Sequence, residues 1–365
     1  MYSKVRAASA LGNFFRNVIV QGRVSTNKVE IGRDRRHTGF VLSASSYVAV
    51  CAFTAACASA LLPNRAVSPA GESWRPAPPM IHARSAHAVA STNDAIYAIG
   101  GTGAGGAPVL SVERFDGNRW LEETSLPGEG LNAPAAVAIG PRIYVIGGFK
   151  TVTNVPTAEV LVYDLASRMW SKAAPLPAPR GGHAAVVLAG RIHVIGGGNS
   201  RSTLADHSEF DPASNSWIER ASLPRSEGSP AAVAFNGKLY AIGGRSGGSD
   251  FGNVYVYDPA TDRWVEGPSI EPRGTAGAAL YCGSIYVFGG ESQAKNAVLS
   301  DVLRLDSRDS AWSTAPPMPT ARNYARAAML GHSVYLIGGN PEVAMSHSAA
   351  GSTLVERFDA SCRTG

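Results

Sequence analysis

The sequence predicts an all-β fold made of six four-stranded sheets arranged in a ring. Two features recur six times along its 365 residues. One is a hydrophobic run that ends in Gly-Gly, and the other is a hydrophobic residue followed directly by Asp. A tryptophan follows this Asp in five of the repeats. The glycine pairs repeat every 46 to 49 residues and begin at Gly100, Gly147, Gly196, Gly243, Gly289 and Gly338. A period of this length is typical of a repeat architecture. Four strands per repeat in a radial arrangement form a β-propeller.

Each repeat begins with two strands that form a hairpin. The second is an apolar run of β-branched and aromatic residues, a composition typical of strands, at 96–99, 143–146, 192–195, 239–242, 285–288 and 334–337. A run of small apolar residues precedes it, for example at 134–139 and 230–235. Only thin side chains fit where several sheets converge, so we place this strand innermost. Short turns such as Asn236-Gly237 join the two strands.

Two further strands complete a repeat. The third ends at Asp116, Asp164, Asp211, Asp258, Asp306 or Asp359, and the fourth carries Trp120, Trp170, Trp217, Trp264 or Trp312. The glycine pair lets the chain leave the second strand in a conformation closed to residues with a Cβ. We expect the recurring aromatic residues to pack between blades. A stacking platform for sugar rings is the alternative, which is disfavoured because the same residues recur in every blade.

The sixth repeat ends before its fourth strand. Four of the five complete repeats place tryptophan six residues after the Asp, but six residues after Asp359 the sequence ends at Gly365. At the other end of the sequence, Trp74 precedes the first inner strand. No third strand precedes Trp74 as one precedes each of the other five tryptophans. We therefore expect the segment around Trp74 to complete the last blade. This closes the ring and removes the exposed edge of an open sheet.

Together these features resemble the kelch repeat: the doubled glycine after an Ile-Tyr-x-Ile strand, the aromatic-Asp-Pro step at 210–212 and 257–259, and the spaced tryptophan. The resemblance covers residues 72–365. It implies a six-bladed kelch β-propeller over residues 66–365, preceded by a leader and linker at 1–65. It implies little about function, since kelch propellers include protein-binding modules, sugar-processing enzymes and a copper oxidase.

The leader predicts an export signal. Residues 1–70 hold nine of the 33 Lys and Arg residues but only two of the 28 Asp and Glu residues, so the net charge of +5 comes from this region. The remaining chain is close to neutral and has no nucleic-acid footprint. Basic residues, Arg35 and Arg36 among them, precede an Ala-rich apolar stretch at about 40–62 and a small triplet at 58–60. We expect an exported protein, either periplasmic or a lipoprotein anchored through Cys57. A retained membrane anchor and another kind of targeting peptide are the alternatives.

The cysteines show no metal-ligand spacing. Two of the four lie in the leader, Cys282 lies in an inner hairpin turn of the fifth blade, and Cys362 lies near the C-terminus. We expect Cys282 and Cys362 on the same face of neighbouring blades, but one inner and one outer. A disulfide between them is therefore possible in an exported protein but is not the favoured interpretation.

The channel mouth is the default binding site of a propeller, because loops leading into the inner strands and loops after the glycine pairs open on one face. Sixteen residues before the glycine pair, four of the six blades hold an arginine, at Arg84, Arg180, Arg273 and Arg322. Such a ring could bind anions such as carboxylates. The favoured alternative is a scaffold role, in which each arginine bonds loop carbonyls or the neighbouring blade. Arg245, outside the repeated position, is the better ligand-binding candidate.

Departures from the repeat provide further candidates. Glu227 takes the arginine position in the fourth blade and could transfer protons in sugar ring opening or epimerisation; an ion pair with the arginines is the favoured role. His183, beside Arg180, is a candidate binding residue. The remaining rim candidates are Glu291, Tyr324, Asn323, Asn199 and Phe149.

We favour an exported, non-catalytic protein that binds a protein segment or glycan at the channel mouth. The chain after the leader shows no nucleophile motif, phosphate loop or metal-ligand spacing, so no cofactor or metal is expected. The alternative is a mutarotase or epimerase acting on an acidic sugar such as sialic acid, with Glu227 as its catalytic group. The resemblance implies this alternative, because a six-bladed, exported kelch mutarotase group exists. A copper oxidase is disfavoured because that family uses seven blades.

Overall fold

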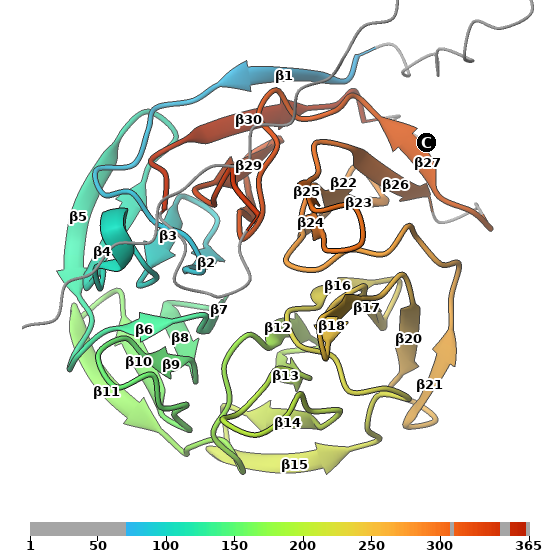
Figure 1. The fold of residues 1–365 in the computed structure, drawn as a ribbon. Helices are drawn as coiled ribbons and strands as arrows, with labels where there is room; N and C mark the ends of the chain where they lie inside the picture. The colour runs from blue at the N-terminus through green and yellow to red at the C-terminus, as the bar shows by residue number, and fades with distance from the viewer. Residues whose placement is uncertain (1–70, 307–309, 344–350, 363–365) are drawn as a thin grey trace, which may run out of the picture. The chain divides into compact units, whose positions relative to one another are not determined.

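The computed structural model describes residues 71–306, 310–343 and 351–362, and these form six four-stranded antiparallel sheets around a central axis (Figure 1). Over these residues the strands are accompanied by one short 3₁₀ turn, Ala104–Gly106. The prediction of an all-β, six-bladed propeller is confirmed.

In the first three blades the strands follow chain order from the axis outward. Blade 1 contains β2 (Ala88–Ser91), β3 (Ile96–Ile99), β4 (Ser111–Phe115) and β5 (Trp120–Ser125). Blade 2 contains β7 (Ala135–Ile139), β8 (Arg142–Ile146), β10 (Val160–Asp164) and β11 (Met169–Ala173). Blade 3 contains β12 (Ala184–Leu188), β13 (Arg191–Ile195), β14 (His207–Asp211) and β15 (Ser216–Arg220).

The other three blades have the same order, except that the last is completed from the start of the propeller. Blade 4 contains β16 (Ala231–Phe235), β17 (Lys238–Ile242), β20 (Val254–Asp258) and β21 (Arg263–Glu266). Blade 5 contains β22 (Gly277–Tyr281), β23 (Ser284–Phe288), β26 (Val302–Asp306) and β27 (Ser313–Ala315). Blade 6 contains β28 (Arg326–Leu330), β29 (Ser333–Ile337), β30 (Val355–Asp359) and β1 (Ser73–Pro76).

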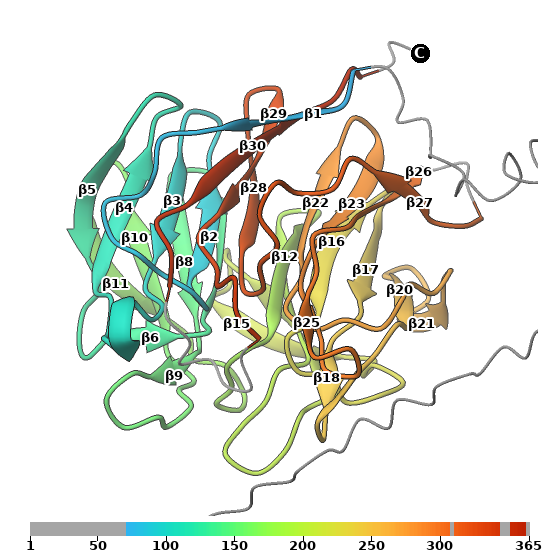
Figure 2. The same cartoon turned by 45° about the horizontal axis from the view of Figure 1, so that its top comes forward.

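Three short ribbons extend from the blades. They pair β6 (Leu131–Asn132) with β9 (Phe149–Lys150), β18 (Arg245–Ser246) with β19 (Ser249–Asp250), and β24 (Glu291–Ser292) with β25 (Ala297–Val298). In Figure 2, β6, β9, β18 and β25 lie on the same, lower side of the propeller. This side is the loop face.

The ring closes as predicted. β1 pairs antiparallel with β30, and Trp74 stands opposite Phe358. Both views show the blue β1 strand along the outside of the red β30 strand (Figures 1 and 2). Because β1 precedes blade 1 in the chain and completes blade 6, it joins the two ends of the ring.

The recurring aromatic residues pack between the strands and the blades. Trp264 lies 5.1 Å from Tyr257 between ring centroids, and its Nε1 donates a hydrogen bond of 2.7 Å to the carbonyl of Ala221, on the chain leaving blade 3. Trp312 repeats this contact at 2.7 Å to Pro268 of blade 4. Each indole therefore ties its blade to the preceding one, which is a structural role.

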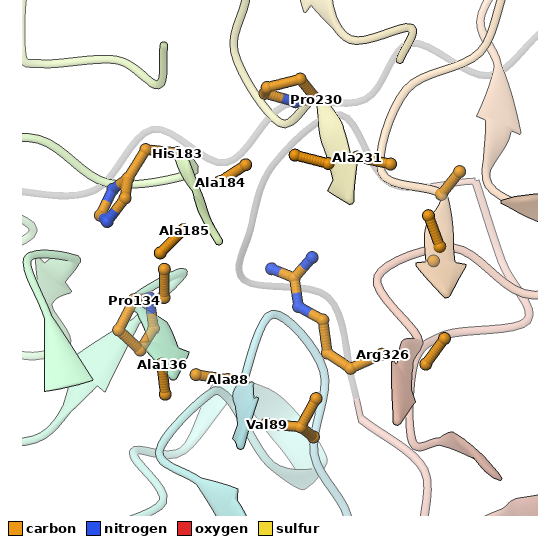
Figure 3. Close-up of a pocket in the computed structure, with 16 residues that line it drawn as sticks. Ala88, Val89, Pro134, Ala136, His183, Ala184, Ala185, Pro230, Ala231 and Arg326 are labelled. Atoms are coloured by element: carbon orange, nitrogen blue, oxygen red, sulfur yellow. The ribbon is translucent and has the colours of Figure 1, made fainter. Parts of the chain in front are cut away.

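Small residues allow the inner strands to converge, as predicted. At the position opposite the last residue before each glycine pair stand Ala88, Ala135, Ala184, Ala231, Gly277 and Arg326. The inner strands line a cavity of about 130 Å³ on the axis. Figure 3 shows the guanidinium group of Arg326 directed toward the middle of this cavity, with alanines around it.

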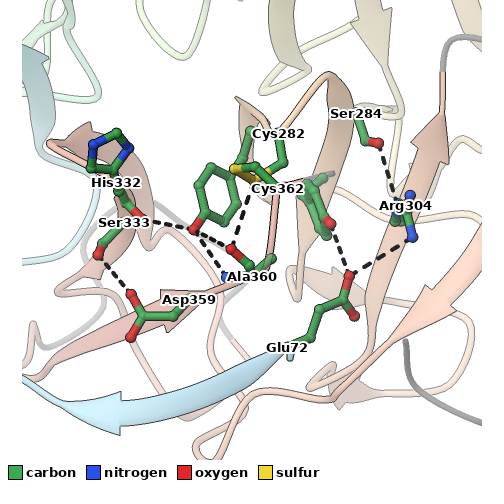
Figure 4. The surroundings of a disulfide bond; sticks show 11 residues. Glu72, Cys282, Ser284, Arg304, His332, Ser333, Asp359, Ala360 and Cys362 are labelled. Atoms are coloured by element: carbon green, nitrogen blue, oxygen red, sulfur yellow. Dashed lines mark hydrogen bonds and ion pairs between the residues drawn. A yellow bond between two sulfur atoms is a disulfide. The ribbon is translucent and has the colours of Figure 1, made fainter. Parts of the chain in front are cut away.

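The disulfide that the sequence analysis did not favour is present: Cys282 and Cys362 are bonded, with their Cα atoms 4.8 Å apart (Figure 4). The physical reason lies in the segment after β30. The fourth strand of blade 6 comes from β1, so this segment is free to cross to the inner hairpin of blade 5. There the Tyr281 hydroxyl accepts a 2.9 Å hydrogen bond from the Ala360 amide and donates one of 2.7 Å to the His332 carbonyl.

The predicted leader, export signal and lipidation site at Cys57 lie outside the described residues, so these expectations stay predictions. In the part of the chain that the structure describes, no helix is long and apolar enough to span a membrane.

Candidate functional site

The loop face is built by pairing two sets of loops. Within one blade, the loop leading into the inner strand forms a bridge with the loop after the glycine pair, as between Gly228 and Arg245, Gly274 and Glu291, and Asn323 and Asn340. Both sets therefore open on the same face, as expected.

A belt of six equivalent residues borders the channel mouth. Ala86, Ala133, Gly182, Ser229, Thr275 and Tyr324 all have a positive φ, between 46° and 60°. From Ala133 to Tyr324, the amide of each residue donates to the carbonyl of the one before it. The distances run from 2.6 Å for Ser229 to Gly182 to 3.3 Å for Thr275 to Ser229. The large member is Tyr324, which is 2% exposed and packs with Ala86 and Ala133. These two alanines belong to blades 1 and 2, so the tyrosine reaches across the mouth.

The four repeated arginines lie inside the blades. Their side chains are at most 1% exposed, and each forms an ion pair: Arg84 with Glu113, Arg180 with Asp206 at 2.8 Å, Arg273 with Asp301 at 2.6 Å, and Arg322 with Glu356 at 2.7 Å. They also donate to loop carbonyls, as Arg84 Nη1 does to Gly100 at 3.1 Å. This is the scaffold arrangement that the sequence favoured. The alternative ring of anion-binding arginines does not form.

Glu227 departs from this arrangement more than expected. Its side chain is fully buried, and neither carboxylate oxygen has a hydrogen-bond partner among the described residues. Where Asp206 and Asp301 stand in blades 3 and 5, blade 4 has Asn253, which accepts a 3.1 Å hydrogen bond from Arg225. Burial raises the pKa of Glu227 to about 8, and the charge of Arg225 opposes this only in part. The favoured ion-pair role of Glu227 is therefore wrong.

Three of the predicted binding residues, Arg245, Glu291 and Tyr324, lie together between blades 4, 5 and 6. Arg245 Nη2 donates to the Glu291 carboxylate, and its Nε lies 3.6 Å from Asp250. The guanidinium also lies 5.9 Å from the centre of the Tyr324 ring. With two carboxylates beside it and 13% of its side chain exposed, Arg245 is already neutralised within the protein.

A pocket of about 340 Å³ opens beside this cluster, formed by loops of blades 2, 3 and 4. We call it the rim pocket and define it by Phe149, Asn199, Arg201, Thr203, Ser229 and Arg245.

Two glycines shape the rim pocket. A Cβ at Gly181 would overlap the Phe149 ring, and one at Gly228 would lie 3.2 Å from the Thr203 side chain. Each glycine therefore lets the loop of the preceding blade lie flat over it.

The rim pocket contains residues that the sequence indicated and one that it did not. Phe149, Asn199 and Arg245 were rim candidates. Arg201 was missed, because it lies in a loop that does not follow the repeat. Its side chain is exposed and forms no ion pair with any residue that the structure describes. Arg201 supplies the open positive charge of the pocket.

His183 lies below the belt and lines the cavity on the axis, away from the rim pocket. Burial, followed by the charges of Arg180 and Arg326, lowers its pKa to about 3, so the imidazole is neutral at neutral pH. Arg326 was also missed, although comparing the first residues of the six inner strands would have found it. Over the described parts of the chain, no group of three or more His, Cys, Asp or Glu residues is placed to hold a metal ion.

The fold and site define a repeat propeller whose loops gather on one face of a rigid frame. A sequence model described as the KLHDC2/KLHL20/DRC7 kelch-repeats domain matches residues 133–339, and the kelch motif matches residues 83–127. The chain belongs to the kelch-repeat family.

Individual relatives match parts of the chain. Alpha-scruin of Limulus polyphemus is 35% identical over 133 residues, which cover 35% of this chain and 14% of that protein. Kelch-like protein 38 of Homo sapiens is 33% identical over 126 residues, covering 34% and 21%. The matches thus span about a fifth or less of these relatives.

A solved structure described as "Structure of YjhT" is similar to this fold. Its TM-score is 0.66 at 17% identity, covering 76% of this chain and 95% of that one. At this identity the similarity concerns the fold alone.

Proposed function

We propose that this protein is a kelch-repeat binding protein whose rim pocket recognises a segment of a partner protein that carries an acidic and an apolar side chain. The observation that carries this proposal is the rim pocket itself. It places the open charge of Arg201 and the ring of Phe149 in one depression of about 340 Å³.

The apolar half of the proposed ligand follows from the loop that holds Phe149. Its tip exposes two large apolar side chains, Val152 at 70% and Val155 at 52%. The loop is held in a turn by the hydrogen bond of 2.9 Å from the Lys150 amide to the Val155 carbonyl. Apolar side chains gathered beside a pocket favour an apolar partner group.

The acidic half follows from Arg201. A guanidinium group binds a carboxylate through two parallel hydrogen bonds. Thr203 and Ser229 border the same pocket and offer hydroxyl groups to the backbone of an extended segment. A neutral glycan would use Phe149 and the hydroxyls but would leave the charge of Arg201 without a partner.

The test is binding of the full-length protein to an array of short peptides that vary in acidic and apolar content. Arg201→Ala and Phe149→Ala should each weaken the best peptide about tenfold, which corresponds to about 1.4 kcal/mol. Arg119→Ala is the matched control, because Arg119 is 72% exposed on the outside of blade 1 and its loss changes the net charge equally. Equal affinity for all three variants would contradict the proposal, as would binding of neutral sugars with no binding of peptides.

The second candidate is an isomerase acting on an acidic sugar, and the unpartnered carboxyl group of Glu227 supports it. With a pKa of about 8, this group can hold or release a proton near neutral pH. Its complete burial requires that blade 4 open before a substrate can touch it. The assay is anomer interconversion of an acidic sugar, which Glu227→Gln should abolish while binding is retained.

Export to an oxidising compartment is part of the proposal. The Cys282–Cys362 disulfide supports it, because disulfides persist in oxidising compartments and are rare in the cytosol. Cell fractionation with thiol labelling tests this point. A cytosolic protein with both thiols free would remove export from the proposal.

A further inference from the structure

A single charged side chain lies in the cavity on the propeller axis. Five blades begin their inner strand with alanine or glycine, and blade 6 begins with Arg326. Of the described residues that line the cavity, Arg326 is the one that carries a charge. His183, the other titratable group in the lining, is neutral at neutral pH for the reason given above.

The guanidinium of Arg326 is anchored at one nitrogen only. Its Nε donates a hydrogen bond of 2.8 Å to the His87 carbonyl of blade 1. The two terminal nitrogens have no hydrogen-bond partner among the described residues, and no described carboxylate forms an ion pair with them. In Figure 3 these two nitrogens point into the cavity, away from the strand that carries them.

This arrangement differs from that of the other interior arginines. Arg84, Arg180, Arg273 and Arg322 each have a carboxylate from their own blade. The Arg326 side chain is only half-buried, so its two terminal nitrogens are open to water or an anion within the cavity. The fixed Nε contact orients the remaining two nitrogens as a fork, and this is the geometry that a carboxylate binds through both oxygens.

The size of the cavity limits the ligand. At about 130 Å³, the cavity is well below the roughly 300–1,000 Å³ typical of sites for drug-sized ligands. The surrounding alanines, among them Ala185 and Ala231, present methyl groups that suit a small apolar tail. We infer that the channel of this protein is a binding site for a small monocarboxylate of about the size of formate or acetate, held on Arg326.

This site is separate from the rim pocket and does not depend on the function proposed for it. The belt borders both sites, with Ser229 lining the rim pocket and the next residue, Pro230, lining the cavity. None of the rim-pocket residues lines the channel cavity.

The first experiment measures the melting temperature of the full-length protein in sodium acetate and in sodium chloride at equal ionic strength. Acetate should raise the melting temperature of the wild type and of the exposed-arginine control Arg119→Gln by mass action. Arg326→Gln should lose this increase. An equal response of all three proteins to acetate would overturn the inference.

The second experiment uses the wild-type protein, so it does not depend on the folding of a variant. The Nε–Hε signal of Arg326, assigned by comparison with Arg326→Lys, is followed by NMR during titration with sodium acetate, sodium chloride and sodium sulfate. A saturable shift with acetate, absent with the other two salts at equal ionic strength, supports the inference. No shift with acetate, or the same shift with chloride, would overturn the assignment to a carboxylate.

Discussion

Blades 4 and 6 depart from the common repeat at two different positions. Comparing the two blades shows which interactions accompany a charged side chain inside the propeller. At the repeated arginine position, blade 6 keeps Arg322 against the buried Glu356, whereas blade 4 has the unpartnered Glu227. At the first position of the inner strand, blade 4 keeps Ala231, whereas blade 6 has Arg326. At the repeated arginine position, blades 1, 3, 5 and 6 show that the buried charge is paired with an opposite charge. Glu227 has no such partner, and neither do the two terminal nitrogens of Arg326 among the described residues.

The largest expected effect is the loss of the pair in blade 6. Arg322→Met should lower the free energy of unfolding by about 3–5 kcal/mol, because it leaves Glu356 buried without its cation. Glu227→Met at the equivalent position of blade 4 should cause no loss, since it removes a group that has no partner. Urea denaturation of the two variants at neutral pH makes the comparison. Equal losses would mean that the position itself, and not the pairing of charges, determines stability.

A second difference between these blades is how they are closed. Blade 4 is one continuous segment, whereas blade 6 takes β1 from the other end of the propeller and is linked to blade 5 by the Cys282–Cys362 disulfide. The double variant Cys282→Ser/Cys362→Ser should lower the free energy of unfolding by about 2–4 kcal/mol.

The control for this prediction is a reducing agent. It should bring the wild type to the stability of the double variant and leave the double variant unchanged. If the reductant does not change the stability of the wild type, and labelling shows that both thiols are free, the disulfide does not contribute to the difference between the blades.

The features that could be predicted from the sequence are those that repeat. Strand order, the innermost position of the small residues and closure by the segment of Trp74 all follow from the offsets within a period of 46 to 49 residues. The acidic partners of the arginines could not be predicted in this way. Glu113 and Glu356 lie within the third strand, but Asp206 and Asp301 lie just before it. The carboxylate that pairs with the repeated arginine therefore comes from either of two different positions in the blade.

The features that the sequence missed are those that occur once. The segment ending at Cys362 reaches blade 5 through contacts of Tyr281 with residues about eighty positions away, which no periodic pattern encodes. Arg201 lies in a loop as long as those of blades 1 and 4, but the equivalent positions there hold Gly105 and Gly248, so the repeat pattern does not single it out. The candidate site therefore depends on departures from the repeat, and only some of these, such as Glu227 and Arg245, are visible by position.

The smallest expected effect is a change in stability with pH that comes from Glu227. It measures how much the missing partner of this carboxyl group destabilises the folded protein. Its pKa is about 8 in the folded protein, compared with an ordinary value near 4.5. Between these values the folded state keeps a proton that the unfolded state has released, so the wild type loses stability as the pH rises through this window. Glu227→Gln lacks this loss, and its stability relative to the wild type should rise by about 1.4 kcal/mol per pH unit. Urea denaturation at pH 5, 6 and 7 measures the slope, with the exposed Glu266→Gln of the same blade as control. A difference that stays constant across this range would show that Glu227 has a partner in solution, and blade 4 would then satisfy its buried charge as blade 6 does.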